Sequence, residues 1–198
     1  MQVEAEFVTS AAGAGDFPRD RLPEIALVGR SNVGKSTLIN ALARRAIART
    51  SAAPGKTRLA NFYRVKAGRS RALYLVDLPG YGYARGGGPA AEEFRQLTNA
   101  YFARDVACGV LLLVDARHPG LDSDRAAWDW LQEQPVPKAV VATKVDKLTR
   151  ADRTRHARQL DSTFACPVRL VSAHTGEGLE ELWKLIVKLP NPTVTAVP

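Results

Sequence analysis

Cysteine is scarce in this chain of 198 residues, which contains only two, Cys108 and Cys166. Their separation fits neither a metal-binding pair nor a redox pair, so both are interpreted as buried, reduced thiols. Histidine is also rare, with three residues, and no Ser–His–Asp or Cys–His set indicates a covalent nucleophile. The sequence therefore gives no reason to expect a metal held by cysteines or nucleophilic catalysis.

Long apolar runs are absent as well. A typical run, residues 110–114, is far shorter than the ~20 residues that a membrane span needs. The N-terminal residues are acidic at Glu4 and Glu6 and lack the basic start and continuous apolar block of a secretory signal. We therefore expect a cytoplasmic protein that does not contact a membrane.

Positive charge is in excess, with 28 Lys and Arg against 20 Asp and Glu, which gives a formal net charge of +8. Such an excess favours a polyanionic partner, because phosphate backbones attract Lys and Arg at long range. Part of the charge falls on one predicted helix as ordinary solvated surface, at Arg150, Arg153, Arg155 and Arg158. Composition alone leaves nucleic-acid binding and incidental charge both open.

Short apolar runs without alternation predict strands that are buried on both faces of a parallel sheet. One segment, residues 61–66, alternates instead and leads through residues 67–70 into the next run, which predicts a hairpin and one antiparallel edge strand. The predicted parallel strands are residues 25–28, 73–76, 109–114, 139–142 and 168–171. Helical patterns lie between them at residues 34–43, about 90–103, about 123–132, about 151–162 and 178–189.

This alternation predicts an α/β fold of the doubly wound type, with a mostly parallel six-stranded sheet and helices on both faces. We expect one domain over residues 1–198, with a core at about 18–189. The N-terminal and C-terminal segments outside that core are expected to be flexible tails.

A complete phosphate-loop pattern, G-x-x-x-x-G-K-[ST], starts directly after the run at residues 25–28 and ends where a helical pattern begins. Glycines at its fixed places let the backbone curl around a phosphate, so that successive N–H groups and the helix N-terminus point at negative charge. Lys35 would reach the β- and γ-phosphates, and the Ser36 hydroxyl would hold Mg²⁺. The nucleotide-binding residues expected here are Gly29, Arg30, Ser31, Asn32, Val33, Gly34, Lys35, Ser36 and Thr37.

The choice between ATP and GTP depends on a T/N-K-x-D pattern at residues 143–146, after a predicted strand. The Asp146 carboxylate can accept hydrogen bonds from the N1–H and exocyclic amine of guanine, whereas adenine has an acceptor at N1 and no amine at C2. Bound adenine would leave this carboxylate unpaired, which costs roughly 1–3 kcal/mol or more. The motif therefore disfavours a metabolic ATP-dependent kinase. Lys144 would lie along the base and brace the phosphate loop. The residues expected at the base are Thr143, Lys144, Val145, Asp146, Val171, Ser172 and Ala173, with the Ala173 amide meeting the guanine oxygen.

Two further motifs would respond to the γ-phosphate. In D-x-x-G, Asp77 at a strand tip can hold Mg²⁺ through water, and the Gly80 N–H can contact the γ-phosphate. Thr57 is the candidate switch threonine, which would ligate Mg²⁺ only while the γ-phosphate is present. The expected nucleotide contacts here are Gly55, Lys56, Thr57, Arg58, Leu59, Asp77, Leu78, Pro79 and Gly80, and the expected metal ligands are Ser36, Thr57 and Asp77.

These motifs in this order are typical of a Ras-like P-loop GTPase. Residues 24–36, 54–57 and 77–84 closely resemble the EngB family of bacterial GTPases (also called YihA or YsxC), in the TrmE-Era-EngA-EngB-Septin-like superfamily. The resemblance implies a small cytosolic GTPase that helps assemble the large ribosomal subunit and is needed for normal cell division and septation. The chain departs from the family pattern at Arg58, where glutamine is usual, and at residues 86–88, where glycines replace a more polar stretch.

Slow intrinsic, Mg²⁺-dependent hydrolysis is the catalytic prediction. Ras-like enzymes usually orient the attacking water with a glutamine directly after D-x-x-G, where this chain has Tyr81. Asn32 allows two interpretations: a K⁺ ligand, because it resembles the potassium-binding asparagine of related GTPases, or an amide that satisfies the loop backbone. The groups expected to act on the reaction, by positioning and electrostatics, are Lys35, Thr57, Gly80 and Asn32.

Two functions remain distinct at this stage. In the first, the nucleotide state sets the affinity for the large ribosomal subunit or its precursor, through rRNA and ribosomal proteins. In the second, the same switch acts in cell division or signalling through a protein partner, without ribosome binding. The absence of a coiled-coil pattern makes a monomer the expected state of association.

Overall fold

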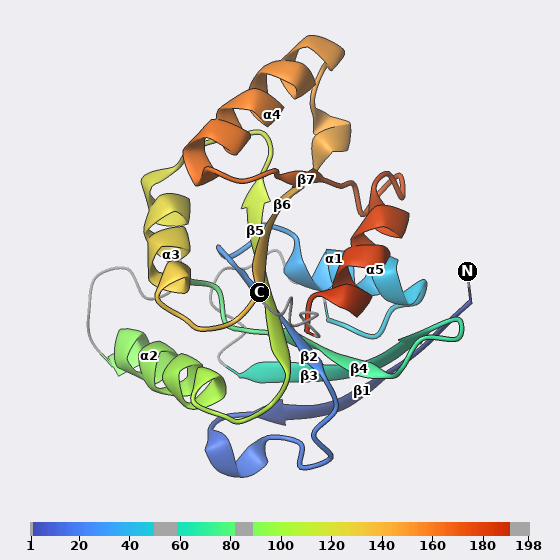
Figure 1. Cartoon of the computed structure of the whole chain (residues 1–198), viewed down its shortest axis with the longest axis vertical. Helices are drawn as coiled ribbons and strands as arrows, with labels where there is room; N and C mark the ends of the chain where they lie inside the picture. Colours follow the sequence, from blue (N-terminus) through green and yellow to red (C-terminus); the bar gives the residue numbers. More distant parts are fainter. Residues whose placement is uncertain (1, 50–58, 82–88, 191–198) are drawn as a thin grey trace, which may run out of the picture.

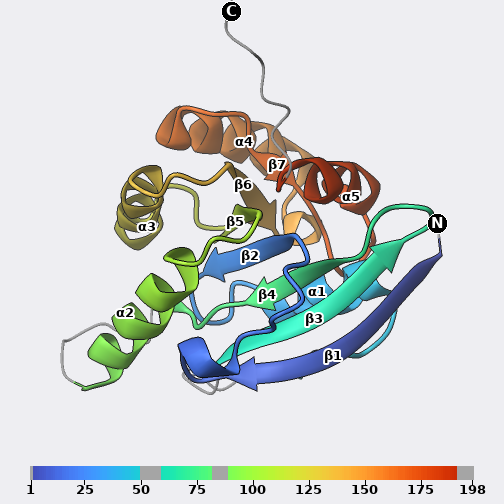
Figure 2. The same cartoon turned by 60° about the horizontal axis from the view of Figure 1, so that its bottom comes forward.

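The computed structural model describes residues 2–49, 59–81 and 89–190. In these residues one seven-stranded sheet carries helices on both faces, as Figures 1 and 2 show. The strands are β1 (Val3–Ala11), β2 (Glu24–Gly29), β3 (Ala60–Ala67), β4 (Leu73–Asp77), β5 (Cys108–Asp115), β6 (Lys138–Thr143) and β7 (Arg169–Leu170). The helices are α1 (Lys35–Ala43), α2 (Pro89–Phe102), α3 (Asp122–Gln132), α4 (Arg150–Phe164) and α5 (Leu179–Lys188), with short 3-10 turns η1 (Ala14–Asp16) and η3 (Val145–Lys147).

The strand order across the sheet is β1-β3-β4-β2-β5-β6-β7, and β2 lies at its centre between β4 and β5. Strands β4, β2, β5, β6 and β7 pair in parallel, while β3 is antiparallel to both of its neighbours. Each of the six predicted strands is present, and so is each predicted helix. The predicted Ras-like α/β fold class is confirmed.

The N-terminal segment is where the structure departs from prediction. Residues expected to form a tail include β1, which pairs antiparallel with β3 from Val3↔Ala67 to Ala11↔Ala60. The sheet therefore has seven strands rather than six, and the antiparallel strand β3 is internal rather than at the edge. The apolar signal of β1 is weak because its buried residues are the alanines Ala5 and Ala11, and because the register shifts between Phe7 and Thr9. The predicted C-terminal tail, residues 191–198, lies outside the described residues.

Alternate residues of the central strands supply the core on opposite sides of the sheet. In β2, Ile25 and Leu27 pack with residues of α1 and α5, while Ala26 and Val28 pack with residues of α2, α3 and α4. Figure 1 shows the two helical layers on opposite sides of the sheet, with α1 and α5 on the right. Because both faces are covered, the parallel strands are apolar throughout, which is why the sequence shows unbroken runs there.

Local chemistry fixes where the helices begin. Thr149 caps α4 by accepting a hydrogen bond from the Asp152 N–H at 3.1 Å, a T-x-x-D pattern. Gly178 precedes α5 with φ +74, and a Cβ there would lie 2.3 Å from the Leu170 carbonyl oxygen. A glycine is therefore required at that turn.

The register aligns the carboxyl ends of the parallel strands. Leu27 of β2 pairs with Asp77 of β4, and Asp115 of β5 pairs with Thr143 of β6. The residues that directly follow these strands consequently gather along one edge of the sheet, the usual location of ligand sites in this architecture. Among the described residues, no helix is long and apolar enough to cross a membrane.

Candidate functional site

The phosphate-loop residues connect β2 to α1, and the structure explains why glycine occupies both fixed positions of the motif. A Cβ on Gly29 would lie 2.8 Å from the Leu113 carbonyl oxygen and 2.8 Å from Val33 Cγ1, so only glycine fits against β5. Gly34 has φ +110 and caps the start of α1. Asn32 also has a positive φ, of 63°, which asparagine tolerates better than most residues. The loop thus turns sharply and delivers the N-terminus of α1 to the sheet edge.

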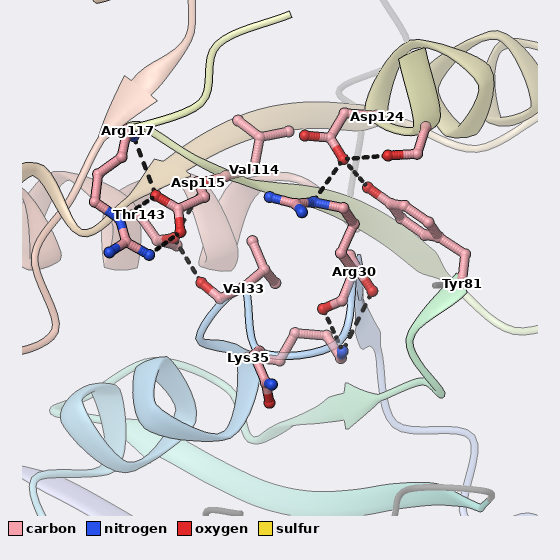
Figure 3. A network of polar contacts seen from close by, with 12 residues as sticks. Arg30, Val33, Lys35, Tyr81, Val114, Asp115, Arg117, Asp124 and Thr143 are labelled. Atoms are coloured by element: carbon pink, nitrogen blue, oxygen red, sulfur yellow. Dashed lines mark hydrogen bonds and ion pairs between the residues drawn. The ribbon is translucent and has the colours of Figure 1, made fainter. Parts of the chain in front are cut away.

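The Lys35 side chain is 8% exposed and points back into this loop. Its Nζ donates to the Gly29 carbonyl at 3.3 Å and to the Arg30 carbonyl at 3.5 Å (Figure 3). Burial lowers the pKa of Lys35, although the nearby Asp77 carboxylate, whose Oδ1 lies 4.0 Å from Nζ, opposes that effect. The ammonium group of Lys35 is thereby held against the phosphate-loop backbone, close to Asp77.

Ser36 and Asp77 come together at the carboxyl end of β4, where Ser36 Oγ donates to Asp77 Oδ2 at 2.9 Å. Burial raises the pKa of Asp77, and the charge of Lys35 and the bond from Ser36 offset this only in part. Asp77 Oδ1 is buried without a hydrogen-bond partner among the described residues. A hydroxyl beside a carboxylate with an unsatisfied oxygen is a donor set that suits Mg²⁺.

Gly80, the glycine of D-x-x-G, lies directly against the phosphate loop. A Cβ at this position would be 2.7 Å from the Ser31 backbone nitrogen and 3.1 Å from the Arg30 carbonyl carbon. The next side chain, Tyr81, turns toward α3, and its hydroxyl donates to Asp124 Oδ1 at 2.7 Å (Figure 3). Asp124 is 1% exposed and also pairs with Arg30, whose Nε is 3.2 Å from Oδ1. The D-x-x-G segment, the phosphate loop and α3 are therefore in mutual contact.

The T-K-x-D residues reach the same loop from β6. Thr143 Oγ1 hydrogen-bonds to the Val33 carbonyl at 2.7 Å and contacts the Val114 carbonyl at 3.1 Å. Lys144 Nζ donates to the Asn32 carbonyl at 2.7 Å. Two adjacent carbonyls of the phosphate loop are thus held by two adjacent residues of this motif.

Asp146 follows on η3, and its side chain is 10% exposed. Ser172 Oγ donates to Asp146 Oδ1 at 2.7 Å and accepts from the backbone N–H groups of His174 and Thr175. The bond from Ser172 outweighs desolvation and lowers the pKa of Asp146, so this carboxylate is ionised at neutral pH. Of the predicted residues 171–173, Ser172 accordingly lies beside Asp146 and orients its carboxylate.

For several predicted site residues the structure gives only the burial, or no description at all. Gly55, Lys56, Thr57 and Arg58 lie outside the described residues, and Leu59 is 37% exposed at the start of the next segment. Among the others, Leu78, Val145 and Val171 are buried, whereas Thr37 is exposed in the first turn of α1.

Three polar residues at this edge escaped prediction: Asp115, Arg117 and Asp124. Asp115 ends β5 and binds Arg117 and Lys144, while Asp124 joins Arg30 to Tyr81. A weak signal for Asp115 was available, because Asp115, like Asp77, directly follows a buried apolar run, although it lacks the D-x-x-G motif that identified Asp77. Asp124 had no such signal, since it lies among other acidic residues at a helix start.

Comparisons with known proteins identify the family and the fold of this chain. The family model described as 50S ribosome-binding GTPase matches residues 24–144. Among solved structures, Era in complex with MgGDPNP and nucleotides 1506–1542 of 16S ribosomal RNA superposes with a TM-score of 0.72 at 22% identity over 85% of this chain. NFeoB from S. thermophilus, bound to GDP·AlF4⁻ and K⁺, gives a TM-score of 0.66 at 23% identity, also over 85% of this chain. This chain spans 57% of the Era chain and 62% of the NFeoB chain, and at these identities both likenesses concern the fold.

The fold and the family match together define a GTPase that binds guanine nucleotides with a Ras-like domain. At the sequence level, the probable GTP-binding protein EngB of Heliobacterium modesticaldum is 44% identical over 189 residues, which cover 92% of this chain and 90% of that protein. The chain belongs to the EngB family.

Proposed function

We propose that this chain is a GTP-controlled assembly factor of the large ribosomal subunit, acting in the cytoplasm and needed for normal cell division and septation. The family match described as 50S ribosome-binding GTPase carries this proposal, because it adds a partner to the nucleotide site. The net charge of +8 is consistent with a partner made largely of RNA. Era, a fold relative, binds a fragment of ribosomal RNA in its solved complex.

In the proposed nucleotide complex, the phosphate loop and Lys35 hold the phosphates, and the Gly80 N–H contacts the γ-phosphate. Ser36 and Thr57 would ligate Mg²⁺, and Asp77 would act on it through a water. The 2.9 Å contact between Ser36 and Asp77 supports the metal assignment. Bound Mg²⁺ would neutralise charge that develops on the phosphate oxygens.

Guanine selection is assigned to Asp146. Its ionised, Ser172-oriented carboxylate suits the two N–H donors on the Watson–Crick edge of guanine. Lys144 lies along the base and fastens it to the phosphate loop, to which it already donates a hydrogen bond.

Intrinsic hydrolysis is expected to be slow. Tyr81 cannot orient water as a glutamine does, and its hydroxyl is already committed to Asp124. K⁺ bound near Asn32 would supply positive charge at the phosphates, and NFeoB, a fold relative, binds K⁺ together with GDP·AlF4⁻. Replacing Na⁺ with K⁺ should raise the hydrolysis rate, and an identical rate would remove K⁺ from the proposal.

Co-sedimentation tests the ribosomal role. The protein, expected to be a monomer, is mixed with large-subunit precursors, mature large subunits or ribosome-free rRNA. Each mixture contains either GDP or a non-hydrolysable GTP analogue. We expect GTP-dependent binding to the large subunit or its precursor that weakens at high salt and in Asp146→Asn. Asp122→Asn makes the same chemical change at a carboxylate that is 93% exposed, and it should bind like the wild type.

The absence of particle binding would favour the alternative function. No binding to any particle in either nucleotide state would contradict the assembly role. A partner that is retained after nuclease treatment would then favour a cell-division or signalling GTPase that acts through a protein.

A further inference from the structure

We propose that Asp115, at the end of β5, is a positioning residue for nucleotide binding, because it holds the Lys144 side chain in place between the base pocket and the phosphate loop. This inference rests on the proposed role of Lys144 at guanine. None of the predicted sequence motifs includes Asp115.

Asp115 is well placed to organise the edge of the sheet. It ends β5, the neighbour of β2, and its register partner on β6 is Thr143, the residue before Lys144. Its side chain is 3% exposed. A carboxylate so deeply buried is costly unless its oxygens are hydrogen-bonded, so the contacts it makes are structurally obligatory.

Arg117 fixes the orientation of this carboxylate. Its Nε donates to Oδ1 at 2.9 Å and its Nη2 to Oδ2 at 2.7 Å, a two-point contact that sets the plane of the carboxylate (Figure 3). The Arg117 backbone N–H adds a third bond to Oδ1 at 3.1 Å. One acceptor position on Oδ2 remains, and Lys144 fills it.

Lys144 Nζ donates to Asp115 Oδ2 at 3.0 Å and to the Asn32 carbonyl at 2.7 Å. A lysine side chain has many rotamers, and ordering one costs up to about 2 kcal/mol of entropy. Two fixed acceptors on different elements leave the ammonium a single position. The lysine is therefore ordered before nucleotide arrives, so binding need not supply that ordering.

The charge state of Asp115 supports this arrangement. Burial alone would raise the pKa of Asp115, but the hydrogen bonds from Arg117 and Lys144 outweigh it and hold the pKa below the ordinary range. The carboxylate therefore stays charged at neutral pH and attracts the ammonium group. An asparagine has nearly the same shape and lacks the charge, which makes it the informative substitution.

The test is a double-mutant cycle on Asp115→Asn and Lys144→Met, measured as the release rate of fluorescent GDP from the full chain. Asp115→Asn should speed release roughly tenfold or more, because a hydrogen bond to a charged group is lost. In the Lys144→Met background the same change should add almost nothing, because Asp115 acts through the lysine. Asp122→Asn, an exposed carboxylate changed in the same way, serves as the matched control and should leave the rate unchanged.

The outcomes separate this inference from the proposed function. Additive effects, or an unchanged rate in Asp115→Asn, would overturn the role of Asp115 while leaving the site intact. If Lys144→Met itself leaves GDP release unchanged, the proposed role of Lys144 fails first. Should Asp115→Asn fold poorly, Arg117→Gln loosens the same carboxylate from an exposed position, and it should also speed release only while Lys144 is present.

Discussion

Replacing Gly80 with alanine adds one methyl group where the D-x-x-G segment touches the phosphate loop. The new Cβ would lie 2.7 Å from the Ser31 nitrogen and 3.1 Å from the Arg30 carbonyl carbon, and both atoms belong to backbone. Gly80 is not among the glycines with positive φ, so alanine is compatible with its conformation and the cost comes from contact alone. Overpacking of this kind costs typically about 1–3 kcal/mol. The segment must then move away from the loop by several tenths of an ångström.

Thermal unfolding of the nucleotide-free protein measures this cost. For a chain of this size, we expect a decrease in Tm of roughly 2–12 °C. The matched control is Gly13→Ala, because Gly13 is extended and a Cβ there would have no atom within 4 Å. That variant should melt with the wild type. If Gly80→Ala is as stable as Gly13→Ala, the close approach of the two segments is not a feature of the folded protein in solution.

Two further predictions concern buried titratable groups. Burial raises the pKa of Asp124 above its unfolded value of about 3.9, so the folded state holds this proton more tightly and stability is lost as pH rises through that window. Urea unfolding from pH 4 to 7 should therefore show the wild type losing stability relative to Asp124→Asn, and a relative gain would contradict the burial argument. Burial also raises the pKa of Cys108 to about 11, which keeps this thiol protonated at pH 8. In a Cys166→Ser variant, a disulfide reagent should react with Cys108 far more slowly in the folded protein than after unfolding in urea, and equal rates would show that the thiol is accessible.

The central strands were predictable because their signal is strong. Parallel strands that are covered on both faces must be apolar throughout. The runs at residues 109–114 and 139–142 show this unbroken apolar pattern. β1 was not predictable in the same way, since it buries alanines and has a bulge, and its stability comes from pairing with β3 rather than from its own pattern. Strand pairing between distant segments is a tertiary property that a local pattern does not carry.

The site residues also differ in whether a local sequence pattern or the tertiary packing determines them. The motif residues were predictable because phosphate and base chemistry impose residue types at fixed spacing. Asp124 was not, because its contacts with Arg30 and Tyr81 depend on how α3 packs against the loop. The pairing of Asp115 with Lys144 likewise depends on the register of β5 against β6.

The central claim is that Asp146 recognises guanine. Competition between GDP and xanthosine diphosphate (XDP) for the nucleotide site tests it most directly. Xanthine has a carbonyl at C2 in place of the guanine amine, so the Asp146 carboxylate should disfavour it, whereas the amide N–H of Asp146→Asn can donate to it. The account predicts that the wild type prefers GDP by roughly tenfold or more and that Asp146→Asn reverses the preference. Equal binding of GDP and XDP by the wild type, or an unchanged GDP preference in Asp146→Asn, would contradict it.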